Sequence, residues 1–178
     1  EGAGEAGPGT DQGDRSAEYA RVLKENERYT DAFDRSRLTA SPLSGLAIVA
    51  CMDSRLDIEE TLGLRTGDAH IIRNAGGIVT DDVIRSLIVS QHVLATDEVI
   101  VIMHTRCGLL DLDEDVLRDR LAAKSGVRRE IALGSFLDLE ASVRASLERL
   151  RADPWLRGPA HGLIFDVSTG RLHEVVDG

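Results

Sequence analysis

The first two thirds of the chain contain three short, mostly apolar runs, at residues 46–50, 69–72 and 99–103. Their apolar residues are consecutive rather than alternating, which is typical of strands buried on both faces of a parallel sheet. Near the C-terminus, residues 163–167 and 172–176 flank a Ser-Thr-Gly turn and predict a hairpin. The pattern therefore predicts five short strands.

Between these strands, apolar residues recur at intervals of three and four, the spacing of a helix that buries one face. The predicted helices cover residues 17–33, 58–62, 81–94, 111–123 and 139–150. Capping residues mark two starts, because Thr80 precedes two aspartates and Ser135 with Asp138 resembles a capping box. This alternation predicts an α/β fold with a mostly parallel central sheet, helices on both faces, an N-terminal helical arm and a C-terminal strand hairpin.

The start of the chain has a different character. Residues 1–16 are rich in glycine and acidic side chains and offer almost nothing to bury, so we expect a flexible tail. Residues 17–178 are expected to form a single α/β domain, whose arm packs on either a partner subunit or its own domain. Because no apolar run approaches the about 20 residues of a membrane span, and no apolar stretch resembles a signal peptide, we expect a cytoplasmic location.

Composition and net charge argue against several kinds of binding partner. The chain has 178 residues, 42% of them hydrophobic, which is enough to bury a core. Its formal net charge of −10 argues against nucleic acid or an anionic membrane as a partner. Aromatic residues make up only 3%, which disfavours a stacking platform for bases or sugars. With only 2 cysteines, the chain is no disulfide-stapled mini-protein, and its thiols point to metal or redox chemistry.

Both cysteines follow predicted buried strands. Cys51 comes directly after the first run, with Asp53 and Arg55 at alternate positions behind it. His104 and Cys107 follow the third run and lie three residues apart. Because the carboxyl ends of parallel strands meet at one edge of a sheet, we expect both groups to lie there. If the chain stays extended past residue 50, Cys51, Asp53 and Arg55 all point the same way.

Two sulfurs and one imidazole form a ligand set that suits zinc. Ligation by Cys51, His104 and Cys107 leaves a fourth tetrahedral position for water, which is typical of a catalytic zinc site. The alternatives are two inert buried thiols or a disulfide between them. Metal binding is favoured because each cysteine lies at a strand end, within four residues of another ionisable group.

The residues beside these ligands have candidate roles of their own. Asp53 and Arg55 form either a surface ion pair or a functional pair, in which Arg55 keeps Asp53 ionised and Asp53 accepts a hydrogen bond from a zinc-bound oxygen. Gly76 and Gly77 are expected to let the backbone approach closely and form one wall of a small substrate pocket. Gly108 is expected to expose its N–H group to that pocket at a helix start.

The combined pattern Cys51-x-Asp53-x-Arg55 and His104-x-x-Cys107 resembles the signature of β-class carbonic anhydrases, in their compact bacterial branch. The likeness extends over most of the chain. It includes a glycine loop, a helix start and a closing hairpin, at residues 73–77, 79–86 and 162–170.

This resemblance implies one Zn2+ per chain, held by Cys51, His104 and Cys107, with Asp53 and Arg55 as the catalytic dyad. It implies the reversible hydration of carbon dioxide to bicarbonate and a proton by a metal-bound hydroxide, in a homodimer or homotetramer. In some relatives the aspartate that matches Asp53 leaves its arginine and becomes a fourth metal ligand, which switches the site off.

Three other functions stay open at this point. One is the hydrolysis of carbon disulfide or carbonyl sulfide on the same scaffold. A second is a non-catalytic interaction module that is stabilised by zinc. A third is a dithiol redox protein, which the lack of a C-x-x-C motif disfavours.

Overall fold

The computed structural model describes residues 12–176 and divides the chain into two compact units, Glu1–Leu38 and Thr39–Gly178. That residues 17–178 form a single domain stays a prediction. We describe the two units separately. None of the helices in the described part has the length and hydropathy of a membrane span.

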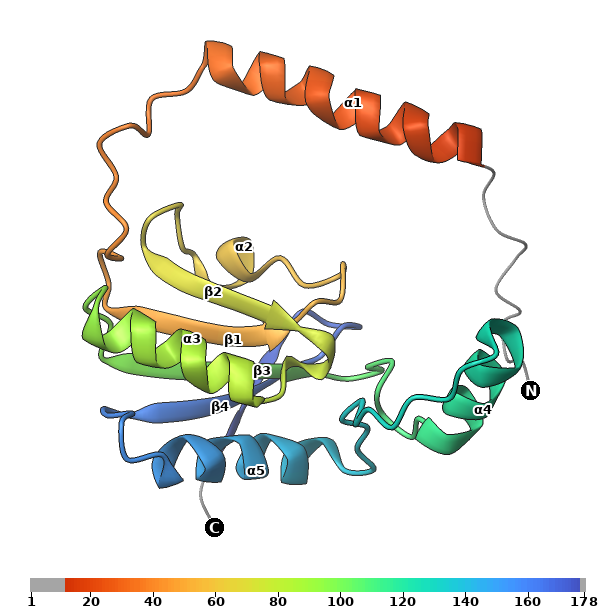
Figure 1. Ribbon diagram of the computed structural model, residues 1–178. Coiled ribbons are helices and arrows are strands. Elements are labelled where there is room, and N and C mark those ends of the chain that lie inside the picture. The colour runs from red at the N-terminus through yellow and green to blue at the C-terminus, as the bar shows by residue number, and fades with distance from the viewer. Residues whose placement is uncertain (1–11, 177–178) are drawn as a thin grey trace. The chain divides into compact units, whose positions relative to one another are not determined.

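The first unit contains helix α1, Gln12–Asp31 (Figure 1). The predicted helical arm is thus confirmed as a helix, and it begins inside the expected tail of residues 1–16. Residues 1–11 lie outside the described residues. Four large apolar side chains of α1 are 48–67% exposed, and they are Tyr19, Val22, Leu23 and Tyr29. The ring of Phe33, just past the helix end, lies 5.7 Å from that of Tyr29, centroid to centroid.

The second unit is built on a five-stranded sheet with the order β2-β1-β3-β4-β5. In chain order the strands are β1 (Leu46–Cys51), β2 (Ala69–Asn74), β3 (Glu98–His104), β4 (Ala160–Phe165) and β5 (Leu172–Val175). Strands β1 to β4 are parallel, and β5 pairs with β4 in the antiparallel sense. The predicted mostly parallel sheet and its closing hairpin are therefore confirmed.

Four helices and one short 3-10 turn accompany the sheet (Figure 1). They are α2 (Ile58–Leu62), η1 (Ala75–Gly77), α3 (Asp81–His92), α4 (Glu114–Ser125) and α5 (Leu139–Ala152). Each α-helix begins after a residue whose side-chain oxygen accepts an N–H three positions on, as an N-cap does.

The start of α5 corrects one prediction. Its N-cap is Asp138, whose carboxylate accepts the N–H of Ala141, and not Ser135. The capping-box interpretation was wrong because the main-chain N–H of Ser135 is held instead by a side chain from α4, that of Glu114.

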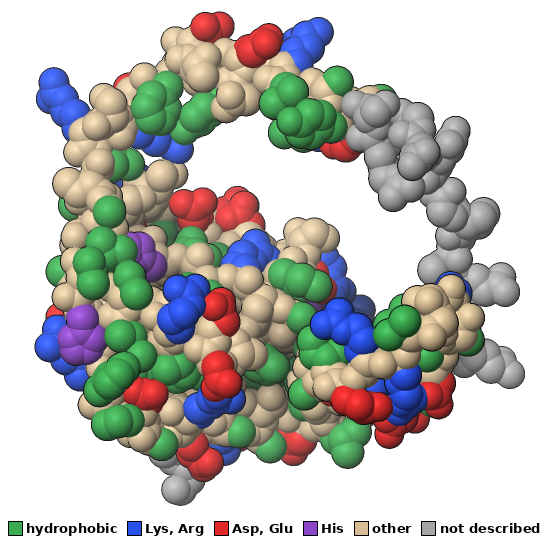
Figure 2. Space-filling view, viewed as in Figure 1, with side chains coloured by type: hydrophobic (Ala, Val, Ile, Leu, Met, Phe, Trp, Pro, Cys, Tyr) green, Lys and Arg blue, Asp and Glu red, His purple; other side chains and the backbone are tan. Residues whose placement is uncertain are grey.

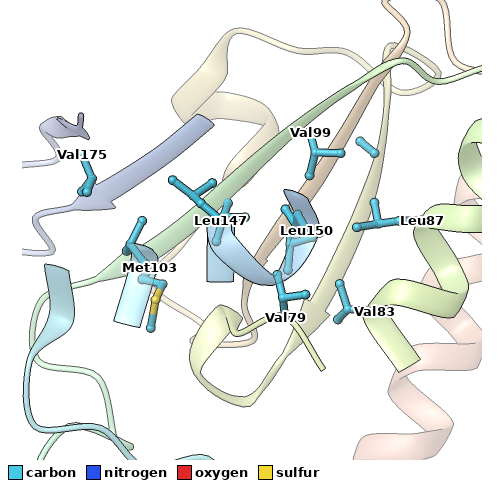
Figure 3. Packing of buried hydrophobic residues seen from close by; sticks show 12 residues of the cluster. Val79, Val83, Leu87, Val99, Met103, Leu147, Leu150 and Val175 are labelled. Carbon is cyan, nitrogen blue, oxygen red and sulfur yellow. The ribbon is translucent and has the colours of Figure 1, made fainter. Parts of the chain in front are cut away.

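The core lies on both faces of the sheet, because alternate residues of the central strands point in opposite directions. Ala47 and Val49 of β1 belong to a cluster with Leu87 of α3 and Leu147 of α5. Figure 3 shows this packing around Leu87, Leu147 and the strand residue Val99. Ile48 of β1 instead belongs to a second cluster that includes residues of α2. Helices therefore cover both faces, as predicted.

Candidate metal centre

Three candidate ligands meet at the carboxyl edge of the sheet. Cys51 ends β1 and His104 ends β3, and these strands are paired neighbours, so the topology brings the two residues together. Cys107 follows three residues after His104. The ligand atoms of all three side chains lie within 4.8 Å of one another, and all three residues are buried. The predicted ligand set is thus assembled at one point.

The imidazole of His104 is oriented for metal binding. Its side chain is fully buried, and Nδ1 lies 2.9 Å from the carbonyl oxygen of Thr105. Because a carbonyl only accepts, Nδ1 carries the proton, and in the neutral form of the ring, the form that binds a metal, Nε2 presents its lone pair. Nε2 is buried and has no hydrogen-bond partner among the described residues. An orphaned nitrogen beside two thiols fits a metal ion that would complete its bonding.

The two thiols are free, with their sulfurs 4.0 Å apart. A disulfide needs about 2.05 Å, so the structure does not contain the bridge that the sequence left open. Burial raises the pKa of both thiols. At Cys51, the His104 side chain and the backbone N–H groups of Asp53 and Gly76 lower the pKa of the thiol, and together they outweigh the effect of burial. The pKa of Cys51 therefore falls to about 7, whereas that of Cys107 is raised by its burial.

Asp53 and Arg55 form a close pair beside these ligands. Arg55 Nε donates to Asp53 Oδ1 at 2.8 Å, and its terminal nitrogen donates to Oδ2 at 2.7 Å. These bonds hold the pKa of the Asp53 carboxyl well below its usual range. Oδ2 lies 3.8 Å from Nε2 of His104, so the ionised carboxylate faces the centre of the ligand set. Arg55 is anchored further by the carbonyl oxygen of Arg106, at 3.0 Å.

The chain reaches this arrangement through a turn. The Leu56 N–H donates to the Asp53 carbonyl at 3.1 Å, and the Arg55 N–H donates to Asp53 Oδ1 at 3.0 Å. Strand β1 ends at Cys51, so the condition that the chain stays extended through Asp53 and Arg55 is not met. An aspartate that binds a nearby backbone N–H favours a turn over continued strand, and this turn places the two side chains together.

Arg73 is a positioning residue that the sequence reasoning missed. Its guanidinium donates to the carbonyl oxygen of Cys51 at 3.0 Å and to that of Asp53 at 2.7 Å. Arg73 belongs to β2, the parallel neighbour of β1. It therefore fixes the backbone from Cys51 to the start of the turn at Asp53. The only signal in the sequence is a basic residue at the end of a neighbouring strand.

The predicted close approach of glycine backbone is found at η1. A Cβ added to Gly77, whose φ is +69°, would lie 2.7 Å from the nitrogen of Cys51 and 2.8 Å from the oxygen of Ile102. Gly76 is also buried. Gly108 differs, because it is exposed and an added Cβ meets nothing within 4 Å. Gly76 and Gly77 thus lie against the strand ends. The prediction that Gly108 lies at a helix start is wrong, because Gly108 lies in a turn and the next helix, α4, begins at Glu114.

Two apolar side chains complete the surroundings of η1. A Cβ added to Gly76 would lie 2.9 Å from Leu109 and 3.6 Å from the ring of Phe136. Phe136 packs on both buried clusters, including the one that contains the two cysteines. It comes from the segment before α5, more than 25 positions after the ligands. Phe136 lies outside the predicted strands and helices, so no periodic pattern marks it in the sequence.

Comparison with known proteins agrees with this arrangement. Residues 46–172 match the family model described as carbonic anhydrase. Beta-carbonic anhydrase 1 of Mycobacterium tuberculosis is 43% identical over 155 residues, which cover 86% of this chain and 94% of that protein. A carbon disulfide hydrolase of Acidithiobacillus thiooxidans is 33% identical over 152 residues, 71% of this chain and 75% of that protein. The crystal structure of carbonic anhydrase from Streptococcus mutans is similar with a TM-score of 0.84 and 40% identity, covering 89% of this chain and 97% of that one.

Proposed function

We propose that this chain, which belongs to the carbonic anhydrase family, catalyses the reversible hydration of carbon dioxide to bicarbonate and a proton. The observation that carries the proposal is the buried Nε2 of His104, which has no hydrogen-bond partner among the described residues and lies close to two thiols and an ionised carboxylate. A merely structural cluster has no need of a fixed carboxylate at its open side.

Zinc is the metal that suits these donors, one ion per chain. Cys51, His104 and Cys107 would hold it, because two thiolates and an imidazole are its preferred ligands and three protein ligands leave one position open. When bound, zinc acts as a Lewis acid that lowers the pKa of water from 15.7 toward ~7 and so supplies a nucleophile at neutral pH.

Asp53 and Arg55 form the proposed catalytic dyad. An ionised carboxylate only accepts hydrogen bonds. Oδ2 of Asp53 would therefore bind the oxygen nucleophile through that nucleophile's O–H group, which leaves a lone pair of the same oxygen free to point toward the substrate. Arg55 prevents the carboxylate from rotating or taking up a proton, because it binds both oxygens. Asp53 is thus a paired carboxylate in this structure, and its ligation of the metal in a closed state stays a prediction of the family resemblance.

The substrate is an uncharged linear molecule, which suits an apolar surface with few polar groups. We assign one wall of its pocket to Gly76, Gly77 and Gly108, and extend it with Leu109 and Phe136. Support comes from the packing of Gly76 against the last two side chains. An apolar wall excludes water that would otherwise surround the nucleophile and weaken the hydrogen bond to Asp53.

The acting unit is proposed to be a homodimer or homotetramer located in the cytoplasm. Support for self-association comes from α1, which carries apolar side chains that are half or more exposed in the single chain. Light scattering coupled to size-exclusion chromatography measures the mass in solution. A monomer at micromolar concentration would contradict self-association.

Carbon disulfide hydrolysis is the second candidate, because a carbon disulfide hydrolase is 33% identical to this chain. Both substrates are uncharged, linear and triatomic, so the same pocket chemistry serves either. Measuring both reactions on one preparation separates them, since the proposal expects faster turnover of carbon dioxide.

The deciding experiment is stopped-flow hydration of carbon dioxide, with the metal content measured on the same samples. Wild-type protein should contain one zinc per chain and be active. Asp53→Ala should lose most activity and keep its zinc, because Asp53 is not needed as a ligand. Cys107→Ser should lose the zinc itself. Full zinc occupancy without hydration activity in the wild type would instead indicate a non-catalytic zinc module.

A further inference from the structure

Glu114, in the first turn of α4, is directed toward the protein rather than into solvent. Its carboxylate accepts the backbone N–H of Leu133 at 3.0 Å and that of Ser135 at 2.8 Å. Its side chain is only 17% exposed, whereas the neighbouring Asp115 is 75% exposed. Leu133 and Ser135 are alternate residues, so one carboxylate occupies the place that a neighbouring strand would take along this segment.

Arg118, one helical turn later, completes this arrangement. It pairs with Glu114 and donates to the carbonyl oxygen of Ile131 at 2.9 Å. The two backbone bonds to Glu114 lower the pKa of its carboxyl to about 2, so it is ionised at working pH. We call Glu114 and Arg118 the α4 clamp. Acidic and basic side chains gather together over α4 in Figure 2.

The clamped segment leads directly to the metal centre. Phe136 follows Ser135, and its N–H donates to the Leu109 carbonyl at 3.1 Å, while its own carbonyl accepts the Asp111 N–H at 2.9 Å. The same stretch is tied to a candidate ligand, because the Leu110 N–H donates to the Cys107 carbonyl at 3.1 Å. The clamp therefore holds a segment that pairs with the residues just after Cys107.

Packing links the same segment to η1 as well. Gly134 lies so close to Ile78 that an added Cβ would be 2.4 Å from its Cδ1 atom. The Phe136 ring lies over Gly76, at the proposed pocket wall. If the clamp were released, Phe136 would no longer be held in place, although every group that touches substrate or metal would still be present.

We propose that Glu114 is a positioning residue for the hydration reaction, which acts by fixing residues 133–136 so that Phe136 closes the apolar wall of the substrate pocket. This inference rests on the proposed function. It makes Glu114, the first residue of a helix with no buried residues, a determinant of how well an uncharged substrate binds.

The chain contains a matched control. Glu140 lies in the first turn of α5 and pairs with Arg144 at the same four-residue spacing, but it is 57% exposed. Among the described contacts, Glu140 accepts only from Arg144, whereas Glu114 also accepts from two backbone N–H groups. Glu140→Ala therefore removes an equivalent helix pair without releasing a loop.

The test compares wild type, Glu114→Ala, Glu114→Gln and Glu140→Ala, all as zinc-loaded protein. We expect Glu114→Ala to lower kcat/KM for carbon dioxide about 10-fold or more, because small displacements of positioning groups cost that much. The loss should fall mainly on KM, since an apolar wall contacts ground state and transition state alike. Glu114→Gln keeps one acceptor oxygen and should be intermediate, and Glu140→Ala should match wild type.

Amide hydrogen exchange gives a readout that is independent of activity. The N–H groups of Leu133 and Ser135 should lose protection in Glu114→Ala and keep it in Glu140→Ala. Unchanged protection, or a KM equal to that of wild type, would overturn the proposal. If Glu114→Ala fails to fold, Glu114→Gln carries the same two comparisons. If wild type has no hydration activity, the proposed function fails, and the exchange data alone then decide whether the clamp exists.

Discussion

Replacing Gly77 by alanine tests whether the backbone of η1 supports the metal ligand. Gly77 has a φ of +69°, and the three atoms nearest to an added Cβ all belong to the backbone: the Cys51 nitrogen at 2.7 Å, the Ile102 oxygen at 2.8 Å and the Ala50 carbonyl carbon at 3.0 Å. Side chains can rotate away from such a contact, but these atoms belong to two paired central strands. The substitution must therefore displace Cys51 or move η1.

The magnitude follows from two separable costs. An L-residue with this left-handed backbone loses about 1–2 kcal/mol. Forcing an extra carbon into a packed site costs about 1–3 kcal/mol more. Gly63→Ala isolates the first cost, because Gly63 has a φ of +66° and an added Cβ there meets nothing within 4 Å. Gly77→Ala should thus be less stable than Gly63→Ala by about 1–3 kcal/mol, or about 2–4 °C in Tm for each kcal/mol.

The assay is thermal and urea unfolding of both variants, with and without a chelator, together with zinc content. The chelated samples are needed because a bound metal stabilises the native state and a loss of zinc alone would lower Tm. Gly77→Ala should also hold zinc more weakly than Gly63→Ala. Equal stability and equal zinc affinity in the two variants would refute the view that η1 braces Cys51.

Two further changes test the support of the site. Arg73→Ala should weaken zinc binding about 10- to 100-fold, because it removes the hydrogen bonds to the Cys51 and Asp53 carbonyls. Competition with a chelator measures this affinity. An unchanged affinity would show that the turn keeps its conformation without Arg73. The pKa of Glu114 is lowered from 4.5 to about 2, so its contribution to stability is complete above pH 4.5 and is lost as the pH falls toward 2. In urea unfolding, the stability difference between wild type and Glu114→Gln should shrink over that range, and a constant difference would contradict the assignment.

The sequence predicted the parts of this fold that local pattern controls. Runs of consecutive apolar residues predict the buried strands, and the rule that parallel strands share a carboxyl edge predicts that Cys51 and His104 lie together. Turn chemistry was predicted less well. The chain bends after Asp53 because that carboxylate captures a backbone N–H, a choice that side-chain alternation alone does not reveal.

The supports of the site were not predictable, because they join distant segments. Glu114 binds Ser135 across 21 positions and Arg73 binds Cys51 across 22. Such contacts carry no periodicity, and a charged residue in the first turn of a helix is already explained by the helix dipole. The helix dipole already accounts for an acidic residue at position 114, so the sequence does not reveal the tertiary contacts of Glu114.

These supports also bear on what the metal does. In a small zinc module the metal supplies the folding energy, and the apo chain is unfolded. Here Cys51 and Cys107 belong to a buried cluster that packs on one face of the sheet, and a second cluster fills the other face. The ligands are placed by strands, by η1 and by Arg73, all of which are protein contacts. Two buried side-chain atoms, Nε2 of His104 and Oδ1 of Asn74, lack a hydrogen-bond partner among the described residues, and each would cost about 1–3 kcal/mol in the apo state. The apo protein should therefore stay folded, which leaves the metal free to act in chemistry rather than in folding.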